Sequence, residues 1–407
     1  MTLLTEHPST VFAAQPKAFA PAPPENRGLR RDQVRLLVAS PDGITHTGFN
    51  TLPEHLQPGD AVVINRSATV AGAWDAQSRL HGRVVLHAAT RLSRAAPATE
   101  GHRRLPAEDW VIEVRTAPDA ARSVLDGEPG EQFNARGLTV TLVEPYPASG
   151  SSPTGRGNRL WRARAQGDLR AYLRRHGRPI AYGYLDRRYP LSDYQTVFGT
   201  VPGSAEMPSA GRPFTHALIT ALVARGIAVL PITLHTGVSS QEAGEAPQPE
   251  WFEVPASTAR LLEATRAGGG RVVAVGTTVT RALESAVADD GRLEGRSGWT
   301  ERVVTPAEPP RVVTGLVTGW HDPQASHLLL VEAVAGRDLT QQAYDEAVRH
   351  GYLWHEFGDA ALVLPGMQPR PYACRSRSVL LLTREDPVAS VPSLGEGQYC
   401  CTERHTN

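Results

Sequence analysis

The chain has 407 residues, of which 41% are hydrophobic and 21% charged, and its 42 Lys and Arg residues balance its 42 Asp and Glu residues. This length allows two or three domains with a substantial core, and the zero net charge argues against a general attraction to nucleic acid. We find no signal peptide and no apolar run long enough to cross a bilayer, so we expect no membrane partner and a cytoplasmic location.

Lysine and cysteine usage disfavours several classes of enzyme. Lys17 is the only lysine and lies in a proline-flanked N-terminal segment, so no better-placed residue can supply a Schiff base or a phosphate-loop cation. Pyridoxal enzymes, class I aldolases and Walker-type ATPases are therefore disfavoured. The three cysteines, Cys374, Cys400 and Cys401, lack C-x-x-C spacing, and we expect neither a disulfide framework nor a metal site.

The first 164 residues favour extended structure and short strands. Residues 1–28 are rich in proline and alanine and are predicted to be an extended segment, whereas Gln33–Ser40 and Ala61–Asn65 are predicted strands. From residue 66 to 164, short apolar runs are separated by Gly, Pro and charged turns, which is typical of a small β-barrel or sandwich. These runs are Gly82–His87, Trp110–Arg115, Leu138–Val143 and Leu160–Ala165.

After Asp168 the patterns of helix and strand alternate, which predicts an α/β domain with a largely parallel or mixed sheet. Helices are predicted at Leu169–Arg175, Pro213–Arg225, Ala256–Ala267, from Val279 onward, and at Leu339–His350. Strands are predicted at Ile227–Leu234, Val272–Val275 and Val312–Val317, and Ser326–Val334 is a further apolar run. From Met367 onward the periodicity is lost, so residues 367–407 are predicted to be a poorly ordered tail.

Six arginines crowd one stretch of the chain against a single acidic residue, Asp186. They are Arg170, Arg174, Arg175, Arg178, Arg187 and Arg188. One interpretation is a solvated helix face, and the other is a strip that contacts phosphates.

The most informative stretch is Gly268–Ser285, in which the predicted strand Val272–Val275 leads through Gly276-Thr277-Thr278 into a helix. Such a turn presents hydroxyls and free N–H groups at the carboxyl edge of a sheet, where open α/β sheets bind ligands. The alternative is an ordinary strand-to-helix corner with threonines as helix caps.

An ordered set of motifs, running from about residue 20 to 366, resembles the S-adenosylmethionine:tRNA ribosyltransferase-isomerase family. The motifs are Arg35–Val38, Pro58–Asp60, Tyr194–Val197, Gly203-Ser204, Pro208–Gly211, Phe214-Thr215, Thr233–His235, Glu250–Val254, Gly268–Ser285, Gly298–Thr300, His321–Pro323 and Phe357–Ala360. No single motif is specific to the family, but their order makes the resemblance strong.

The resemblance implies a mixed α/β domain, residues 29–65 and 165–366, with an inserted small β-barrel domain, residues 66–164. It also implies transfer of the ribosyl moiety of S-adenosylmethionine to the 7-aminomethyl-7-deazaguanine base of tRNA. The ribosyl unit is isomerised to give epoxyqueuosine, and adenine and methionine are released. S-adenosylmethionine is a substrate in this reaction, and no other cofactor and no metal is expected. The tRNA anticodon stem-loop is the expected partner, and a monomer is favoured.

This chemistry needs a base for the carbon beside the sulfonium and donors for the departing adenine. The resemblance implies His235 and His321 as base or donor, although a lone histidine is more often structural. It also implies Glu250 and Glu253, which flank aromatic residues suited to a sulfonium, as carboxylates in the site. The alternative for the two glutamates is a solvated face of an amphipathic strand.

The resemblance also implies a set of substrate-binding residues: Tyr194, Gln195, Thr196, Gly276, Thr277, Thr278, Arg281, Trp320 and Asp359. Thr277, Thr278 and Arg281 could hold the methionine carboxylate or ribose hydroxyls, and Tyr194 and Gln195 could stack on and bond a purine-like base. The alternatives are a salt bridge of Arg281 to Glu284, aromatic packing for Tyr194 and Trp320, and a turn fixed by Asp359.

The chain departs from the family pattern in three segments that are expected near the substrate. The family's histidine before Phe214 is replaced in Arg212-Pro213, two histidines are missing from the shortened stretch Thr236–Pro249, and Gly319–Ser326 is altered. Two other functions therefore stay open. The chain could cleave S-adenosylmethionine or transfer its ribosyl group to a small-molecule acceptor, or it could be a non-catalytic relative that binds RNA or a ligand.

Overall fold

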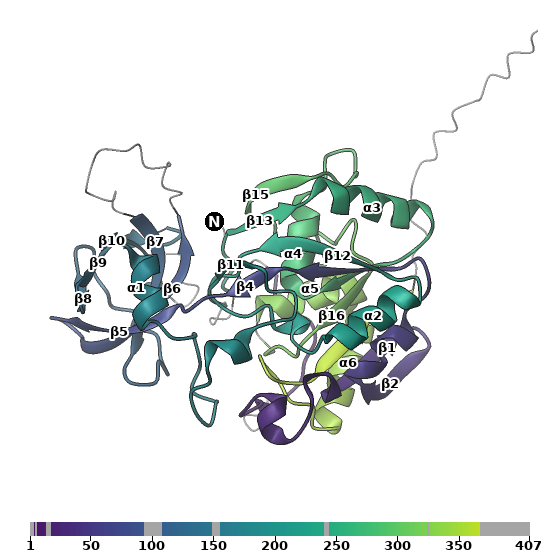
Figure 1. Cartoon of the computed structure of the whole chain (residues 1–407), viewed down its shortest axis with the longest axis horizontal. Helices are drawn as coiled ribbons and strands as arrows, with labels where there is room; N and C mark the ends of the chain where they lie inside the picture. The colour runs from purple at the N-terminus through teal and green to yellow at the C-terminus, as the bar shows by residue number, and fades with distance from the viewer. Residues whose placement is uncertain are drawn as a thin grey trace, which may run out of the picture. The chain divides into compact units, whose positions relative to one another are not determined.

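A nine-stranded mixed sheet forms the centre of the computed structural model (Figure 1), which describes residues 4, 6–13, 18–92, 108–148, 155–239, 244–323 and 325–366. The strand order is β15-β13-β12-β3-β14-β16-β17-β1-β2. Neighbours from β12 to β16 are parallel, and the strands at both edges are antiparallel. The strands are β1 (Arg35–Ser40), β2 (Gly43–Gly48), β3 (Ala61–Asn65), β12 (Ala228–Leu234), β13 (Glu250–Val254), β14 (Val272–Val275), β15 (Arg296–Thr300), β16 (Gly315–Thr318) and β17 (Ala360–Val363).

Helices cover both faces of this sheet. Ala61 and Val63 of β3 pack into one core with α3, α4 and α5, whereas Val62 and Ile64 pack into another with α2 and the 3-10 helix η4. Because neighbouring residues of a strand face opposite sides, burial on both sides makes the inner strands continuously apolar. The helices are η4 (Phe49–His55), α2 (His216–Ala224), α3 (Ala256–Ala267), α4 (Thr277–Ser285), α5 (Ser326–Ala335) and α6 (Arg337–Arg349).

A closed six-stranded barrel, in the order β10-β7-β6-β5-β8-β9, interrupts the α/β chain (Figure 1). Its strands are β5 (Ala73–Ser78), β6 (Gly82–Arg91), β7 (Glu108–Thr116), β8 (Gln132–Ala135), β9 (Leu138–Pro145) and β10 (Leu160–Gln166). Leu169 and Leu173 of α1 (Leu169–His176) pack into the barrel core. The mixed α/β fold with an inserted barrel is thus confirmed, whereas the domain limits remain a prediction.

The chain enters and leaves the barrel through a short parallel pair, β4 (Ser67–Thr69) and β11 (Val201–Ser204). Barrel and sheet lie in one compact unit, Met1–Met367. No helix among the described residues is long and apolar enough to cross a membrane. The predicted tail, residues 367–407, lies outside the described residues.

Several predicted elements need correction. The strand predicted at Val312–Val317 begins only at Gly315, because the N–H groups of Arg311, Val312 and Val313 donate to the Glu284 carboxylate instead. The helix expected from Val279 begins at Thr277. Within the predicted extended segment 1–28, Pro24–Arg27 forms a 3-10 helix with proline at its first position.

Candidate active site

A cleft lies at the edge of the sheet where β12, β14 and β16 end. The turn Gly276–Thr278 forms part of its wall, and the segments Thr236–Ser239 and Thr318–Asp322 also line it. These are the carboxyl ends of parallel strands, which is the usual ligand-binding edge of an open α/β sheet. Two of the segments that depart from the family pattern, Thr236–Pro249 and Gly319–Ser326, contribute residues to this cleft.

The N-terminus of α4 faces this cleft. Gly276 adopts a φ of 95° between β14 and the helix, a conformation that favours glycine, and Thr277 and Thr278 line the cleft. The first N–H groups of a helix have no partner within it and carry a partial positive charge. This end of α4 therefore suits an anionic group of a ligand.

Arg281 of α4 forms one wall of the cleft together with Glu250 of β13. Its guanidinium donates to the Glu250 carboxylate and, at 2.8 Å, to the backbone oxygen of Gln248. Glu250 also accepts from the N–H of Gly237 at 2.9 Å. Burial raises the pKa of Glu250, while the charge of Arg281 opposes that rise. The alternative pairing of Arg281 with Glu284 is wrong, because the Glu284 carboxylate accepts backbone N–H groups.

Three histidines meet at the other side of the cleft. The rings of His321 and His327 stack with centroids 5.0 Å apart, and His355 Nε2 lies 3.7 Å from the carboxylate of Asp322. Burial lowers the pKa of His321 well below its ordinary value, that of His327 to about 4, and that of His355 as well. All three imidazoles are therefore neutral at pH 7 and can accept a proton.

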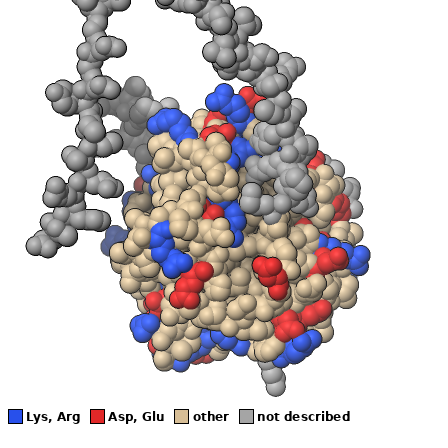
Figure 2. Space-filling model, turned by 90° about the vertical axis from the view of Figure 1, so that its right-hand side faces the viewer, with Lys and Arg blue, Asp and Glu red and all other residues tan. Residues whose placement is uncertain are grey.

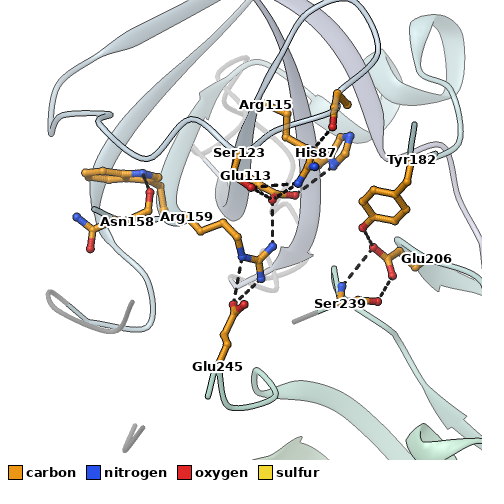
Figure 3. Close-up of polar contacts among 12 residues, drawn as sticks. His87, Glu113, Arg115, Ser123, Asn158, Arg159, Tyr182, Glu206, Ser239 and Glu245 are labelled. Atoms are coloured by element: carbon orange, nitrogen blue, oxygen red, sulfur yellow. Dashed lines mark hydrogen bonds and ion pairs between the residues drawn. The ribbon is translucent and has the colours of Figure 1, made fainter. Parts of the chain in front are cut away.

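Two carboxyl groups that the sequence did not indicate complete the cleft: Glu206 is buried and Glu356 is half-buried. Glu356 accepts from the hydroxyl of Tyr184 at 3.1 Å, and desolvation together with the charge of Glu206 raises the pKa of Glu356 to about 8. Glu206 accepts from the Tyr182 hydroxyl and from the N–H and hydroxyl of Ser239, at 3.2 and 2.5 Å (Figure 3). Glu356 is therefore mainly protonated at pH 7.

We expect Glu356 to give the folded protein a distinct pH dependence. Its folded-state pKa of about 8 lies above the ordinary value of 4.5, so stability is full below pH 4.5 and is lost as the pH rises through 8. The Glu356→Gln variant should flatten this decline in the free energy of unfolding, measured with urea at pH 5, 7 and 9. The exposed Glu54→Gln variant is the control, and an equally steep decline in Glu356→Gln would contradict the assignment.

Two predicted catalytic residues do not line this cleft. His235 Nδ1 shares a hydrogen bond of 2.8 Å with Ser67 Oγ. The His235 ring stacks on Trp251, with the ring centroids 5.3 Å apart. Burial lowers the pKa of His235. Glu253 forms an ion pair with Arg66 at 2.9 Å. Both side chains are thus separate from Glu250 and His321, with which the sequence grouped them.

The remaining predicted residues divide between packing and the cleft. Trp320 lines the cleft but is only 2% exposed and packs against Tyr344 and Tyr352. The others make contacts that hold the scaffold. Tyr194 packs on Phe357, and the Gln195 amide forms hydrogen bonds with the backbone of Thr69. Thr196 Oγ1 accepts from the N–H of Phe198, and Asp359 pairs with Arg35 at 2.7 Å.

One group of side chains among the described residues has the composition of a metal site. His46, Glu346 and His350, on β2 and at the end of α6, bring one ligand atom each to within 4.8 Å of the others. They do not line the cleft. The absence of a metal from the reaction remains a prediction.

Comparison with known proteins gives one consistent family. The family model described as queuosine biosynthesis protein matches residues 9–363. A protein named S-adenosylmethionine:tRNA ribosyltransferase-isomerase from Gloeobacter violaceus is 33% identical over 363 residues, which cover 87% of this chain and 95% of the relative. A protein of the same name from Symbiobacterium thermophilum is 34% identical over 346 residues, with 82% and 94% covered. The crystal structure of S-adenosylmethionine tRNA ribosyltransferase from Thermotoga maritima covers 87% of this chain and 99% of its own, at 26% identity and a TM-score of 0.46.

Proposed function

The chain belongs to the queuosine biosynthesis protein family, and from this premise we propose that the cleft at the end of β14 is where S-adenosylmethionine is cleaved. The enzyme is an S-adenosylmethionine-dependent ribosyltransferase-isomerase. It transfers the ribosyl moiety to the aminomethyl group of a 7-deazaguanine base in tRNA, and adenine and methionine leave. Transfer to a small molecule and a non-catalytic role are not favoured, because the relatives that share most of the chain carry the tRNA-modifying name.

The α4 N-terminus is the proposed cradle for the methionine carboxylate. The free N–H groups and the hydroxyls of Thr277 and Thr278 suit an anion there. Arg281, which the sequence suggested for this task, already donates to Glu250 and to three backbone oxygens. We assign it instead to holding Glu250, whose carboxylate offers negative charge toward the cationic sulfur.

The three histidines supply the proposed base. A positive sulfonium makes the hydrogen on the neighbouring carbon acidic, and a neutral imidazole can take that proton without repelling the sulfonium. His321 is favoured because its Nε2 lies 2.9 Å from Thr318 Oγ1, which orients the ring. The Asp322 carboxylate lies 3.7 Å from His355 Nε2, and the φ of 68° at His355 is unusual for a residue with a side chain.

Glu356 is the proposed donor to the leaving adenine. A carboxyl group that stays protonated at pH 7 can donate a hydrogen bond or a proton to a ring nitrogen as the bond to the ribose breaks. The single observation that supports the assignment is therefore that one cleft contains neutral imidazoles, a protonated carboxyl group and a helix N-terminus. We further propose that the acceptor is the anticodon stem-loop, that the protein acts as a monomer and that it works in the cytoplasm.

Adenine release tests the function. We expect the purified full chain to form adenine from S-adenosylmethionine only when tRNA with the aminomethyl base is present, as measured by chromatography. tRNA that carries guanine at the same position is the control and should give no adenine. Release at the same rate without tRNA would favour the small-molecule alternative, and no release under any condition would favour the non-catalytic one.

A further inference from the structure

A second pocket lies between the barrel and the segment that leads away from it. Val85 and His87 of β6 line it from the barrel, and most of the residues between Arg178 and Tyr189 line it from the other side. Tyr182 lies in its wall, and the hydroxyl of this tyrosine donates to Glu206, which lines the catalytic cleft (Figure 3). Tyr182 therefore connects the wall of this pocket to the wall of the proposed cleavage site.

Three arginines of the crowded stretch 170–188 lie around this pocket. Arg178 pairs with Asp75 at 2.7 Å, Arg188 donates to the backbone oxygen of Pro118 at 2.8 Å, and the exposed Arg187 guanidinium lies 5.1 Å from the Tyr189 ring. Each contact uses only part of the five N–H donors of a guanidinium. By contrast, basic and acidic side chains are interspersed among the described residues on the face drawn in Figure 2.

The floor of the pocket contains a fully buried hydrogen-bond acceptor. His87 is 0% exposed, and its Nδ1 lies 3.2 Å from the Glu113 carboxylate. Arg115 and Arg159 donate to Glu113 at 2.7 and 3.1 Å and hold its pKa well below the usual range (Figure 3). Because an ionised carboxylate only accepts, Nδ1 of His87 carries the hydrogen, and in the neutral ring Nε2 is then the acceptor.

Nε2 of His87 has no hydrogen-bond partner among the described residues. Buried polar atoms are nearly always paired, so a missing partner points to a ligand that carries an N–H or O–H group. Edges of nucleobases carry such N–H groups, and single-stranded bases bind proteins through their edges and by stacking on aromatic rings. Phosphates in turn match the guanidinium groups at the rim.

We propose that this pocket binds a nucleotide that flanks the modified base in the substrate RNA. The base enters the pocket beside Tyr182 and donates an N–H to Nε2 of His87, and its phosphate contacts Arg187 and Arg188. This inference rests on the proposed function, since it takes RNA as the acceptor. It extends that function by assigning one side of the barrel to RNA recognition.

The test compares two double variants with equal loss of charge. The variant Arg187→Ala/Arg188→Ala removes the two arginines at the rim of the pocket. The control Arg225→Ala/Arg260→Ala removes two exposed arginines, one directly after α2 and one in α3. With an anticodon stem-loop that carries the aminomethyl base, we expect the first variant to raise the KM for RNA about tenfold and leave the KM for S-adenosylmethionine within about twofold. The slope of log KM against log salt should fall by roughly 0.7, since each phosphate neutralised on a single strand contributes about 0.7 and the two arginines contact one phosphate.

A third variant tests the base edge. His87→Gln keeps a donor for Glu113 and removes the Nε2 acceptor, and circular dichroism and melting temperature check that it folds. Compared with the wild type, this variant should have a higher KM for the intact RNA. For an RNA that is abasic at the flanking position, the variant and the wild type should have the same KM. Equal KM values in the rim variant and its control, with adenine formed by the wild type, would overturn the pocket alone. If the wild type formed no adenine with any RNA, the proposed function would be overturned. Direct measurement of RNA binding by the three variants would then test the proposed RNA pocket separately.

Discussion

Replacing His321 with alanine is expected to lower kcat for adenine release by about 10²–10⁴, the usual contribution of a positioned general base. The imidazole lies in the cleft, is neutral at pH 7 because burial lowers its pKa, and is oriented by Thr318. The KM for S-adenosylmethionine should change little, because the proposed carboxylate cradle at α4 is untouched. Added imidazole should restore part of the rate.

His235→Ala is the informative comparison for this experiment. Its ring bonds Ser67 and stacks on Trp251, and it does not line the cleft. We therefore expect a loss of less than about tenfold in kcat, well below the range for a general base. A loss in His235→Ala as large as that in His321→Ala would return His235 to the catalytic site, as the sequence suggested.

Arg281→Ala is expected to lower the free energy of unfolding by about 3–5 kcal/mol, the cost of removing one partner from a buried ion pair. Arg281 is 5% exposed, and its removal leaves the Glu250 carboxylate with the N–H of Gly237 as its one remaining donor among the described residues. Turnover should be lost as well, because the charge balance of the cleft changes. Urea denaturation followed by circular dichroism measures the first effect.

The matched control is Arg349→Ala. Arg349 also pairs with a glutamate, Glu346, but its side chain is 68% exposed, so the loss should be about 1 kcal/mol or less. The second comparison is the double variant Arg281→Ala/Glu250→Gln, which should recover part of the stability because no buried charge remains unpaired. Equal losses in Arg281→Ala and Arg349→Ala would show that the Arg281–Glu250 pair does not hold the cleft together.

Local patterns were sufficient for the inner elements of the fold. The strands β3 and β14 and the helix α3 begin and end where the sequence predicted, because each is an apolar or periodic run bounded by glycine, proline or a polar turn. The antiparallel strands β2 and β5 were not predicted. Both contain exposed or small residues. They form strands because of the strands they pair with more than because of their own composition.

Only part of the candidate site was predictable. The Gly276–Thr278 turn was found because strand, glycine and helix start are neighbours in sequence. His327 and Glu356 were missed, because their significance comes from contacts made across the fold. His327 looks like an isolated polar residue in a mostly apolar helix. The raised pKa of Glu356 depends on desolvation in the folded protein and on Glu206, 150 residues earlier in the chain.

The most direct test of the central claim is one quantified single-turnover reaction. Full-length protein is mixed with S-adenosylmethionine and tRNA that carries the aminomethyl base, and adenine, methionine and the modified nucleoside are measured by mass spectrometry over time. We predict that the three products appear together in equal amounts and that they form about 10²–10⁴ times more slowly when His321 is replaced with alanine. Adenine without modified RNA, or products at the wild-type rate from the His321→Ala variant, would contradict ribosyl transfer to tRNA from this cleft.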